Sequence, residues 1–284
     1  MKICRTKSEI QLVLTDLRKG GRTIGAVPTM GALHDGHLSL VDIAARECDV
    51  AVATIFVNPL QFAPHEDFDA YPRTLESDGA LLAERGCDIL FAPERAGLFP
   101  SDFSTTVSVA GVGENHCAVA RPHFFDGVAT IVAKLLLILR PDVAVFGEKD
   151  FQQLAVIRRM VRDLDIDVRV LGGPTVRESD GLAMSSRNQY LSASERAIAP
   201  ALFRTICEAG ERISAPGAKW SEIGVWARDA IIDAGFSSVD YVDFVDAASL
   251  ENIDAAGPEA RILTAARLGE TRLIDNIAVA TTGG

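Results

Sequence analysis

Two histidines three residues apart, His34 and His37, stand where a helix-like segment at 38–47 begins. A strand-like stretch at 23–27 precedes them. The sequence between reads Val27-Pro28-Thr29-Met30-Gly31-Ala32-Leu33-His34-Asp35-Gly36-His37. Backbone N–H groups at a helix start have no intrahelical partner and can hold a phosphate, and imidazoles there add directional donors. The pattern predicts a nucleotide site. The alternatives are a surface turn with two solvated histidines, or a metal pair without a third nearby ligand.

A second polar motif follows the apolar run at 50–57, where Asn58 and Gln61 lie in a short loop. Side-chain amides both donate and accept hydrogen bonds, which suits the hydroxyl and carboxylate groups of a small polar substrate. Taken alone, such residues more often stabilise their own loop.

Two further motifs carry positive charge. Gly147-Glu148-Lys149-Asp150 follows a strand-like run at 143–146 and opens a helix that carries Gln152 and Gln153, a pattern suited to phosphate and a magnesium ion. A helix cap with a Lys–Asp pair is the alternative. Met184-Ser185-Ser186-Arg187-Asn188 offers hydroxyls and a guanidinium that can clamp a polyphosphate, or a polar turn between domains.

The segments around these motifs alternate between strand and helix patterns. Strands are predicted at 23–27, 50–57, 88–91, 143–146 and 167–171, and helices at 8–19, 38–47, 74–85, 127–139 and 151–164. Strands that are apolar on both faces and separated by helices indicate a doubly wound, Rossmann-like parallel sheet, which makes the fold class α/β. Such a sheet binds its ligand outside the carboxyl ends of its strands, where the motifs fall.

The pattern changes after residue 176. Helices are predicted at 194–213 and 221–234, followed by strands at 239–245, 261–266 and 271–278. This order indicates a second, smaller α+β domain. We predict a nucleotide- and substrate-binding domain at 1–176 and a C-terminal lid domain at 177–284, joined by a short hinge near Val176.

Composition narrows the functional classes. The chain has 284 residues and a net charge of −11, which argues against a general nucleic-acid binder. Its five cysteines form no C-x-x-C pair, which favours a reducing compartment over a disulfide scaffold. The N-terminus lacks the apolar core of a signal peptide, and the longest apolar run, at 131–139, is too short to span a bilayer. We expect a cytoplasmic protein that binds neither membrane nor nucleic acid.

Together the motifs resemble those of the pantoate–β-alanine ligase family, within the nucleotidylyltransferase superfamily related to class I aminoacyl-tRNA synthetases. The similarity extends over nearly the whole chain. The matching stretches are Pro28-Thr29-Met30-Gly31 with His34 and His37, Ile55-Phe56-Val57-Asn58-Pro59-Leu60-Gln61-Phe62, Tyr71-Pro72-Arg73-Thr74-Leu75, Phe146-Gly147-Glu148-Lys149-Asp150, Gln153, Met184-Ser185-Ser186-Arg187-Asn188 and Thr271-Arg272-Leu273-Ile274-Asp275-Asn276.

The resemblance implies an ATP-dependent condensation of (R)-pantoate with β-alanine to pantothenate. The reaction would pass through pantoyl adenylate and release AMP and pyrophosphate. ATP is the implied co-substrate and Mg²⁺ the implied metal, without assigned protein ligands. A homodimer is also implied.

The resemblance also implies site residues. His34, His37 and Lys149 are the expected catalytic residues, with His37 as the proton donor. The residues expected to bind ATP are Met30, Gly31, Ala32, Leu33, His34, Asp35, Gly36, His37, Gly147, Glu148, Lys149, Asp150, Val176, Met184, Ser185, Ser186 and Arg187. Asn58, Gln61 and Gln153 are expected to hold pantoate and β-alanine.

One stretch departs from the family pattern. The family has Arg-Pro-Gly-His-Phe-x-Gly-Val where this chain has Arg121-Pro122-His123-Phe124-Phe125-Asp126-Gly127-Val128. The local turn and any role of the replaced histidine therefore do not carry over. Gly127 and the helix after it still match, so we expect the fold to persist.

Two other functions share some of these motifs. A simple adenylyl- or cytidylyltransferase would use the His34–His37 element, but it would not need the two-glutamine pocket or the second domain. A nucleotide-binding regulator without turnover, or a degenerate tRNA-binding relative, is disfavoured by the intact charged set and the acidic composition.

Overall fold

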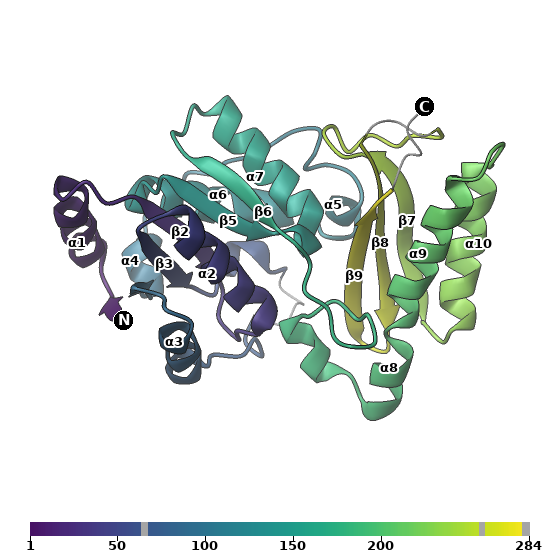
Figure 1. Cartoon of the computed structure of the whole chain (residues 1–284), viewed down its shortest axis with the longest axis horizontal. Helices are drawn as coiled ribbons and strands as arrows, with labels where there is room; N and C mark the ends of the chain where they lie inside the picture. The colour runs from purple at the N-terminus through teal and green to yellow at the C-terminus, as the bar shows by residue number, and fades with distance from the viewer. Residues whose placement is uncertain (64–67, 256–258, 280–284) are drawn as a thin grey trace.

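The computed structural model describes residues 1–63, 68–255 and 259–279. Figure 1 shows a larger sheet flanked by helices and, beside it, a smaller sheet with its own helices. The larger sheet has six parallel strands in the order β1-β4-β3-β2-β5-β6, and the smaller has three antiparallel strands in the order β7-β8-β9. The predicted class, a doubly wound α/β sheet with an added α+β part, is confirmed.

The strand bounds follow the apolar runs of the sequence. They are β1 Lys2–Cys4, β2 Ile24–Thr29, β3 Val50–Ile55, β4 Ile89–Phe91, β5 Val143–Gly147, β6 Arg169–Gly173, β7 Ser238–Asp246, β8 Ala260–Leu268 and β9 Thr271–Ala278. Strand β2 lies between β3 and β5, with Ile24 opposite Val50 and Gly25 opposite Val143. The loops that follow these three central strands therefore meet at one edge of the sheet.

Helices cover both faces of the larger sheet and one face of the smaller. Their bounds are α1 Lys7–Lys19, α2 Asp35–Glu47, α3 Leu75–Glu84, α4 Arg95–Leu98, α5 Cys117–Ala120, α6 Phe124–Leu139, α7 Phe151–Asp163, α8 Ala193–Ile198, α9 Ala201–Ile213 and α10 Trp220–Asp233. Short 3-10 helices are η1 Pro59–Gln61, η2 Glu148–Asp150 and η3 Ser186–Tyr190. Helix α6 is buried along most of its length because it packs against α1, α7 and η1.

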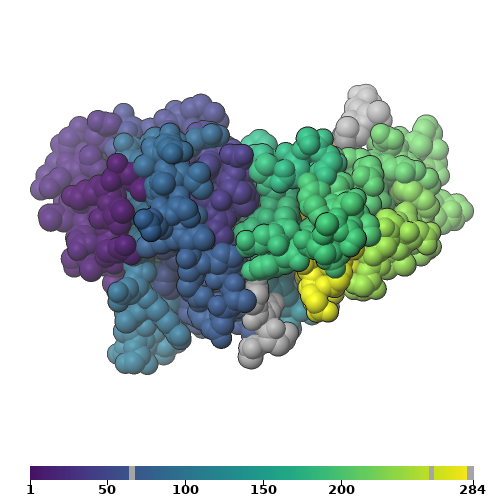
Figure 2. Space-filling model, turned by 90° about the horizontal axis from the view of Figure 1, so that it is seen from below, coloured from purple at the N-terminus to yellow at the C-terminus, as the bar shows by residue number. Residues whose placement is uncertain are grey.

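The smaller sheet joins two hydrophobic cores. One face carries Val242, Phe244 and Ile262 and packs with α9 and α10, which lie on the side away from the larger sheet (Figure 1). The other face contributes Tyr241 and Leu263 to the core that also holds the apolar side of α6. Figure 2 shows the two halves of the chain occupying opposite ends of the molecule.

The structure differs from the sequence-based boundaries at two helices. The helix predicted at 194–213 is divided into α8 and α9 at Pro200, whose missing N–H and ring prevent one continuous helix. Helix α6 begins at Phe124, ahead of the expected start at Gly127, because the preceding His123 already turns the chain. Within the described residues, no helix combines the length and apolarity needed to cross a bilayer.

Candidate active site

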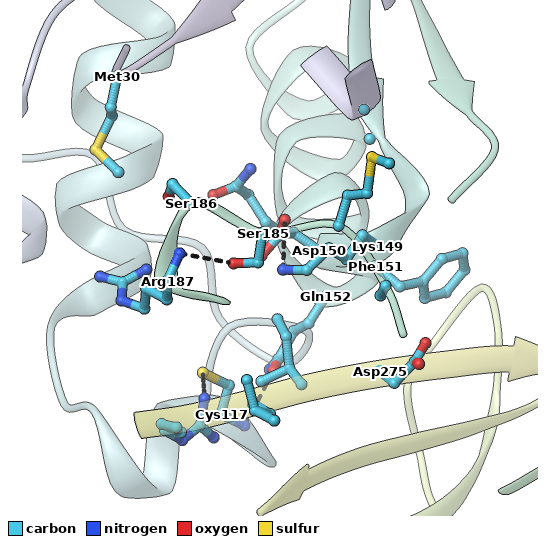
Figure 3. Close-up of a pocket in the computed structure, with 18 of the residues that line it drawn as sticks. Met30, Cys117, Lys149, Asp150, Phe151, Gln152, Ser185, Ser186, Arg187 and Asp275 are labelled. Carbon is cyan, nitrogen blue, oxygen red and sulfur yellow. Dashed lines mark hydrogen bonds and ion pairs between the residues drawn. The ribbon is translucent and has the colours of Figure 1, made fainter. Parts of the chain in front are cut away.

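A cavity of about 910 Å³ lies where the central strands of the larger sheet end and β8 and β9 of the smaller sheet approach. Figure 3 shows side chains from both parts of the chain around it. The predicted residues on its wall are Met30, His34, Gly36, His37, Asn58, Gln61, Gly147, Lys149, Asp150, Gln153, Val176, Met184, Ser185, Ser186 and Arg187. Those away from its wall are Gly31, Ala32, Leu33, Asp35 and Glu148.

The two histidines form a reciprocal cap at the start of α2. His34 is the N-cap residue, and its Nδ1 accepts the Gly36 N–H at 3.2 Å. His37 Nδ1 in turn accepts the His34 N–H at 3.4 Å. Gly36 is required between them because a Cβ there would lie 2.9 Å from the His34 ring. Since each Nδ1 accepts a hydrogen bond, a neutral ring carries its proton on Nε2.

Both imidazoles are held in the neutral form. Burial lowers the pKa of His34 to about 4, and the Lys149 charge acts in the same direction. Burial lowers the pKa of His37 to about 3, again with help from His34 and Lys149. The rings lie 4.1 Å apart between centroids, so protonating one would also disfavour charge on the other. The pair presents two neutral Nε2–H donors.

The backbone amides of the turn before α2 are already occupied. The Asp78 carboxylate, buried at the start of α3, accepts the N–H groups of Ala32 and Leu33 at 2.9 Å each and the Thr74 hydroxyl at 3.0 Å. The Gly31 N–H donates to Thr29 Oγ1. Asp78 and the histidine cap therefore occupy the N–H groups of Ala32, Leu33, His34 and Gly36, which were expected from the sequence to be free for a phosphate. The donors that we assign to an anion at this turn are therefore the two imidazole rings.

Asn58 and Gln61 have different surroundings, although both reach the cavity. Asn58 Nδ2 donates to Gln61 Oε1 and to Gly127 O, both at 3.0 Å, and its Oδ1 accepts the Leu60 N–H. These contacts use both N–H groups of Asn58 inside the protein. Gln61 is left with Nε2 near the Met30 sulfur, at 2.9 Å, on the cavity side. Asn58 thus fixes the direction in which the Gln61 amide faces.

Lys149 stands in η2, directly after β5, on a loop that the smaller sheet holds. Asn276 of β9 donates from Nδ2 to Glu148 O and to Lys149 O, each at 2.9 Å. Arg261 donates to Asn276 Oδ1 and lies over the Phe151 ring, 3.7 Å from its centroid. The Lys149 side chain is largely buried in the wall, with Nζ 3.8 Å from the Asp150 carboxylate.

The loop that carries Ser185, Ser186 and Arg187 closes another side of the cavity. Ser185 caps η3 by accepting the Arg187 N–H at 3.3 Å (Figure 3). The Ser186 hydroxyl lies 3.3 Å from Tyr71 OH, and the Arg187 guanidinium lies 5.9 Å from the centre of the Tyr71 ring. Tyr71 therefore connects this loop with the segment that follows β3.

A buried ion pair ties the start of the second half of the chain to β9. Arg177 donates from both terminal nitrogens to the Asp275 carboxylate, at 2.6 and 2.8 Å, and lies over the Phe203 ring. Asp275 and Asn276 are neighbours on β9. This strand therefore binds the connection near Val176 through Asp275 and the Lys149 loop through Asn276. Besides the contact of Asn276 with the Lys149 loop, the two halves also meet at His116, whose ring nitrogens bond Asp243 at 2.7 Å and Leu250 O at 2.8 Å.

The stretch that departs from the family pattern keeps its helix. His123 adopts φ +68°, in the left-handed region that favours glycine, and its side chain is exposed. Phe124 lines the cavity, and the Arg121 guanidinium lies 3.8 Å from the centre of its ring. Arg121 also donates to Gln61 O at 3.1 Å. The turn survives without glycine, and the expected persistence of the fold is confirmed.

Several wall residues were not singled out as site residues from the sequence. They are Tyr71, Arg121, Phe124, Arg272, Asp275 and Asn276. All of them lie in stretches that match the family pattern or in the one stretch that departs from it, so the sequence did mark these segments. It did not say which side chains face the cavity.

Fold and site place the chain among α/β enzymes that act at the strand ends of a doubly wound sheet. The model of the family "Pantoate-beta-alanine ligase" matches residues 2–278. A pantothenate synthetase of Rhodospirillum rubrum is 52% identical over 98% of this chain and 99% of its own length. One of Sphingopyxis alaskensis is 53% identical over 98% of this chain and 100% of its own.

Solved structures agree. The pantothenate synthetase of Thermus thermophilus superimposes with a TM-score of 0.93 at 45% identity, covering 98% of this chain and 99% of that one. The pantoate–β-alanine ligase of Francisella tularensis, in complex with "Beta-gamma ATP and Beta-alanine", gives 0.82 at 31% identity, with 98% and 97% covered. The chain belongs to the pantoate–β-alanine ligase family, whose ligase activity forms pantothenate. The family and the ligase activity predicted from the sequence are confirmed.

Proposed function

We propose that the chain condenses (R)-pantoate with β-alanine in two steps, using ATP and passing through pantoyl adenylate. The observation that carries the proposal is one cavity that gathers neutral imidazole donors, Lys149 and the amides of Gln61 and Gln153. ATP is supported as co-substrate by the Francisella tularensis relative, which was solved with an ATP compound and β-alanine.

In the first step, a carboxylate oxygen of pantoate bonds to the α-phosphorus while the bond from that phosphorus to the bridging oxygen breaks. Pyrophosphate leaves with the electron pair. Negative charge gathers on the α-phosphate oxygens and on the leaving group, where fixed donors and cations stabilise it best. We assign Lys149 to the transferring phosphate and His34 and His37 to the α- and β-phosphates.

The role of His37 follows from its protonation state. With a pKa of about 3, it is neutral at physiological pH, so it has no extra proton to give. Its Nδ1 also accepts the His34 N–H, which a protonated ring would oppose. We propose that His37 stabilises charge by donating a hydrogen bond from Nε2, in place of the proton transfer expected from the resemblance.

Gln61 and Gln153 are assigned to pantoate, through its hydroxyl and carboxylate groups. Gln61 is the last residue of η1, which follows β3, and Gln153 lies in the first turn of α7; both line the cavity. Asn58 is assigned a positioning role, because its own donors are used in holding Gln61. β-Alanine would enter beside Gln61.

Nucleotide binding is assigned to the strand-end loops. Gly147, Asp150 and the backbone at Val176 would frame the ribose and adenine. Ser185, Ser186 and Arg187, which also line the cavity, would hold the β- and γ-phosphates. Mg²⁺ would arrive with these phosphates and neutralise the leaving pyrophosphate. Among the described residues, no group of three or more His, Cys, Asp or Glu side chains could hold the ion by itself, so its ligands would come mainly from the phosphates.

In the second step, the amine of β-alanine attacks the acyl carbon of the adenylate. A C–N bond forms, the bond from that carbon to the AMP oxygen breaks, and the nitrogen loses a proton. Water must be kept from the adenylate until then. We propose that residues 177–284 form a lid domain for this purpose over the domain 1–176, with the boundary at the Arg177–Asp275 pair.

Two wider properties accompany this proposal. A homodimer and a cytoplasmic location are proposed from the family. The five cysteines are unpaired in the structure, as a reducing compartment would keep them.

The test is AMP release with ATP, pantoate and β-alanine, each omitted in turn. AMP should form only with all three, whereas pyrophosphate–ATP exchange should need pantoate alone. Product formation that does not require β-alanine would favour a simple nucleotidylyltransferase, and ATP binding without AMP would favour a regulator. His37→Ala should lower exchange roughly 100-fold. Gln61→Ala should mainly raise the pantoate KM, and an unchanged KM would refute its role.

A further inference from the structure

Arg272 of β9 stands on the cavity wall with part of its guanidinium unsatisfied. Its Nε donates to Asp240 Oδ2 at 2.7 Å, and its Nη1 donates to Cys117 Sγ at 3.6 Å. Its Nη2 is buried and has no hydrogen-bond partner. In Figure 3 the Cys117 sulfur and this contact lie beside β9, apart from Lys149 and Asp150.

This arrangement leaves Nη2 without an acceptor, and the neighbouring Tyr241 ring lies with its centre 5.9 Å from the guanidinium carbon. A thiol sulfur is a weak acceptor, and a buried N–H without any acceptor destabilises the folded protein. The two terminal nitrogens of arginine form a planar fork that matches a carboxylate in a two-bond contact. The edge formed by Nη1 and Nη2 is therefore built to receive a carboxylate that enters the cavity.

The place of Arg272 fits the amine substrate better than the nucleotide. Cys117 begins α5, and Arg121 directly after that helix donates to Gln61 O. Helix α5 rises about 1.5 Å per residue over its four residues, roughly 6 Å in all. Helix α5 therefore connects Arg272, through Cys117, with the Gln61 loop, through Arg121. Lys149 and Arg187, the other strong cations assigned above, belong to the phosphate side.

We propose that Arg272 binds the carboxylate of β-alanine and thereby directs its amine toward the acyl carbon of the adenylate. The inference rests on the proposed two-step function. In that reaction the pantoate carboxylate is consumed by adenylation, so a second carboxylate in the cavity belongs to the amine substrate. Selection of β-alanine over amines without a carboxylate follows from this contact.

The experiment compares β-alanine with β-alaninamide, which has the same length but no negative charge, in the AMP-release assay of the full chain. For the native protein, kcat/KM should favour β-alanine. Arg272→Gln should lower kcat/KM for β-alanine roughly 30-fold and leave that for β-alaninamide within about twofold, the range of one or two charge-assisted hydrogen bonds. Arg267→Gln, which removes an exposed arginine at the same cavity, is the matched control and should keep the native ratio.

Two further measurements separate the ways in which this can fail. Pantoate-dependent pyrophosphate exchange should be unchanged in Arg272→Gln, because β-alanine takes no part in it. Absence of that exchange in the native protein refutes the proposed function itself. Equal losses for both amines, or an unchanged ratio, overturn the role of Arg272 and leave it a structural partner of Asp240. If the single variant does not fold, Arg272→Gln/Asp240→Asn avoids an unpaired carboxylate and is judged by the same ratio.

Discussion

The contact between Asn276 and the Lys149 loop gives a prediction whose size follows from the structure. Asn276→Ala removes two hydrogen bonds from Nδ2 to the carbonyls of Glu148 and Lys149, and one that Oδ1 accepts from Arg261. At about 1 kcal/mol each, the three bonds stabilise the folded protein by about 3 kcal/mol. Urea unfolding should show a loss of this size.

The same substitution should slow the chemistry. Without Asn276, the loop of η2 is no longer held to β9, and Lys149 loses its fixed place on the cavity wall. A displacement of about 1 Å at a catalytic group costs on the order of 100-fold in rate. We therefore expect pantoate-dependent pyrophosphate exchange to fall 30- to 100-fold in kcat, roughly, with smaller changes in the KM for ATP.

Asp243→Asn is the matched control, because it weakens another contact between the two halves of the chain, the one to His116, without touching the Lys149 loop. It should lower stability but keep the exchange rate. If Asn276→Ala loses the expected stability and still exchanges at the native rate, Asn276 only holds the sheet in place and the reasoning is refuted.

Three more predictions concern the supports of the site. Asp78→Asn turns an NH₂ group toward one of the two turn amides, so the free energy of unfolding in urea should fall by about 3 kcal/mol. A fall of less than about 1 kcal/mol would contradict the role of that carboxylate. His123→Gly relieves a left-handed residue and should stabilise the protein by about 1 kcal/mol, measured the same way, whereas any loss would show that the turn is not strained. The stability of the folded protein should rise with pH up to about 6.5. His34 and His37 have lowered pKa values in the folded protein, so the unfolded chain binds more protons and stability is lost as the pH falls toward those values. Above that pH, stability should decline as the pH passes through the pKa of His116. Burial alone would lower this pKa, but the hydrogen bonds to Asp243 and Leu250 O raise it. Asp243→Asn should abolish the decline, and a decline that persists would belong to another group.

Local patterns predicted the elements of the site well. The strand, the turn and the helix around His34 are readable because strand apolarity, Gly36 and the helix periodicity all lie within a few residues. The break at Pro200 was also readable, since proline lacks the N–H that a helix interior needs. The prediction of one continuous helix through Pro200 gave too much weight to the helical periodicity.

Partners distant in the sequence could not be predicted. Asn58 was expected to bind substrate, yet its amide is used by Gly127, 69 positions further along the chain. The turn amides were expected to be free, yet Asp78 accepts two of them from α3. Whether a polar side chain meets a ligand or another residue depends on tertiary packing, which spacing does not encode.

Neutral imidazoles also bear on how pyrophosphate departs in the proposed reaction. A donor without net charge lacks the Coulomb attraction that an imidazolium ion would add to the same hydrogen bond with an anion. Pyrophosphate formed beside His34 and His37 is therefore released more easily than it would be from two imidazolium ions. The burial that keeps both rings uncharged thus limits product inhibition and helps the enzyme to turn over.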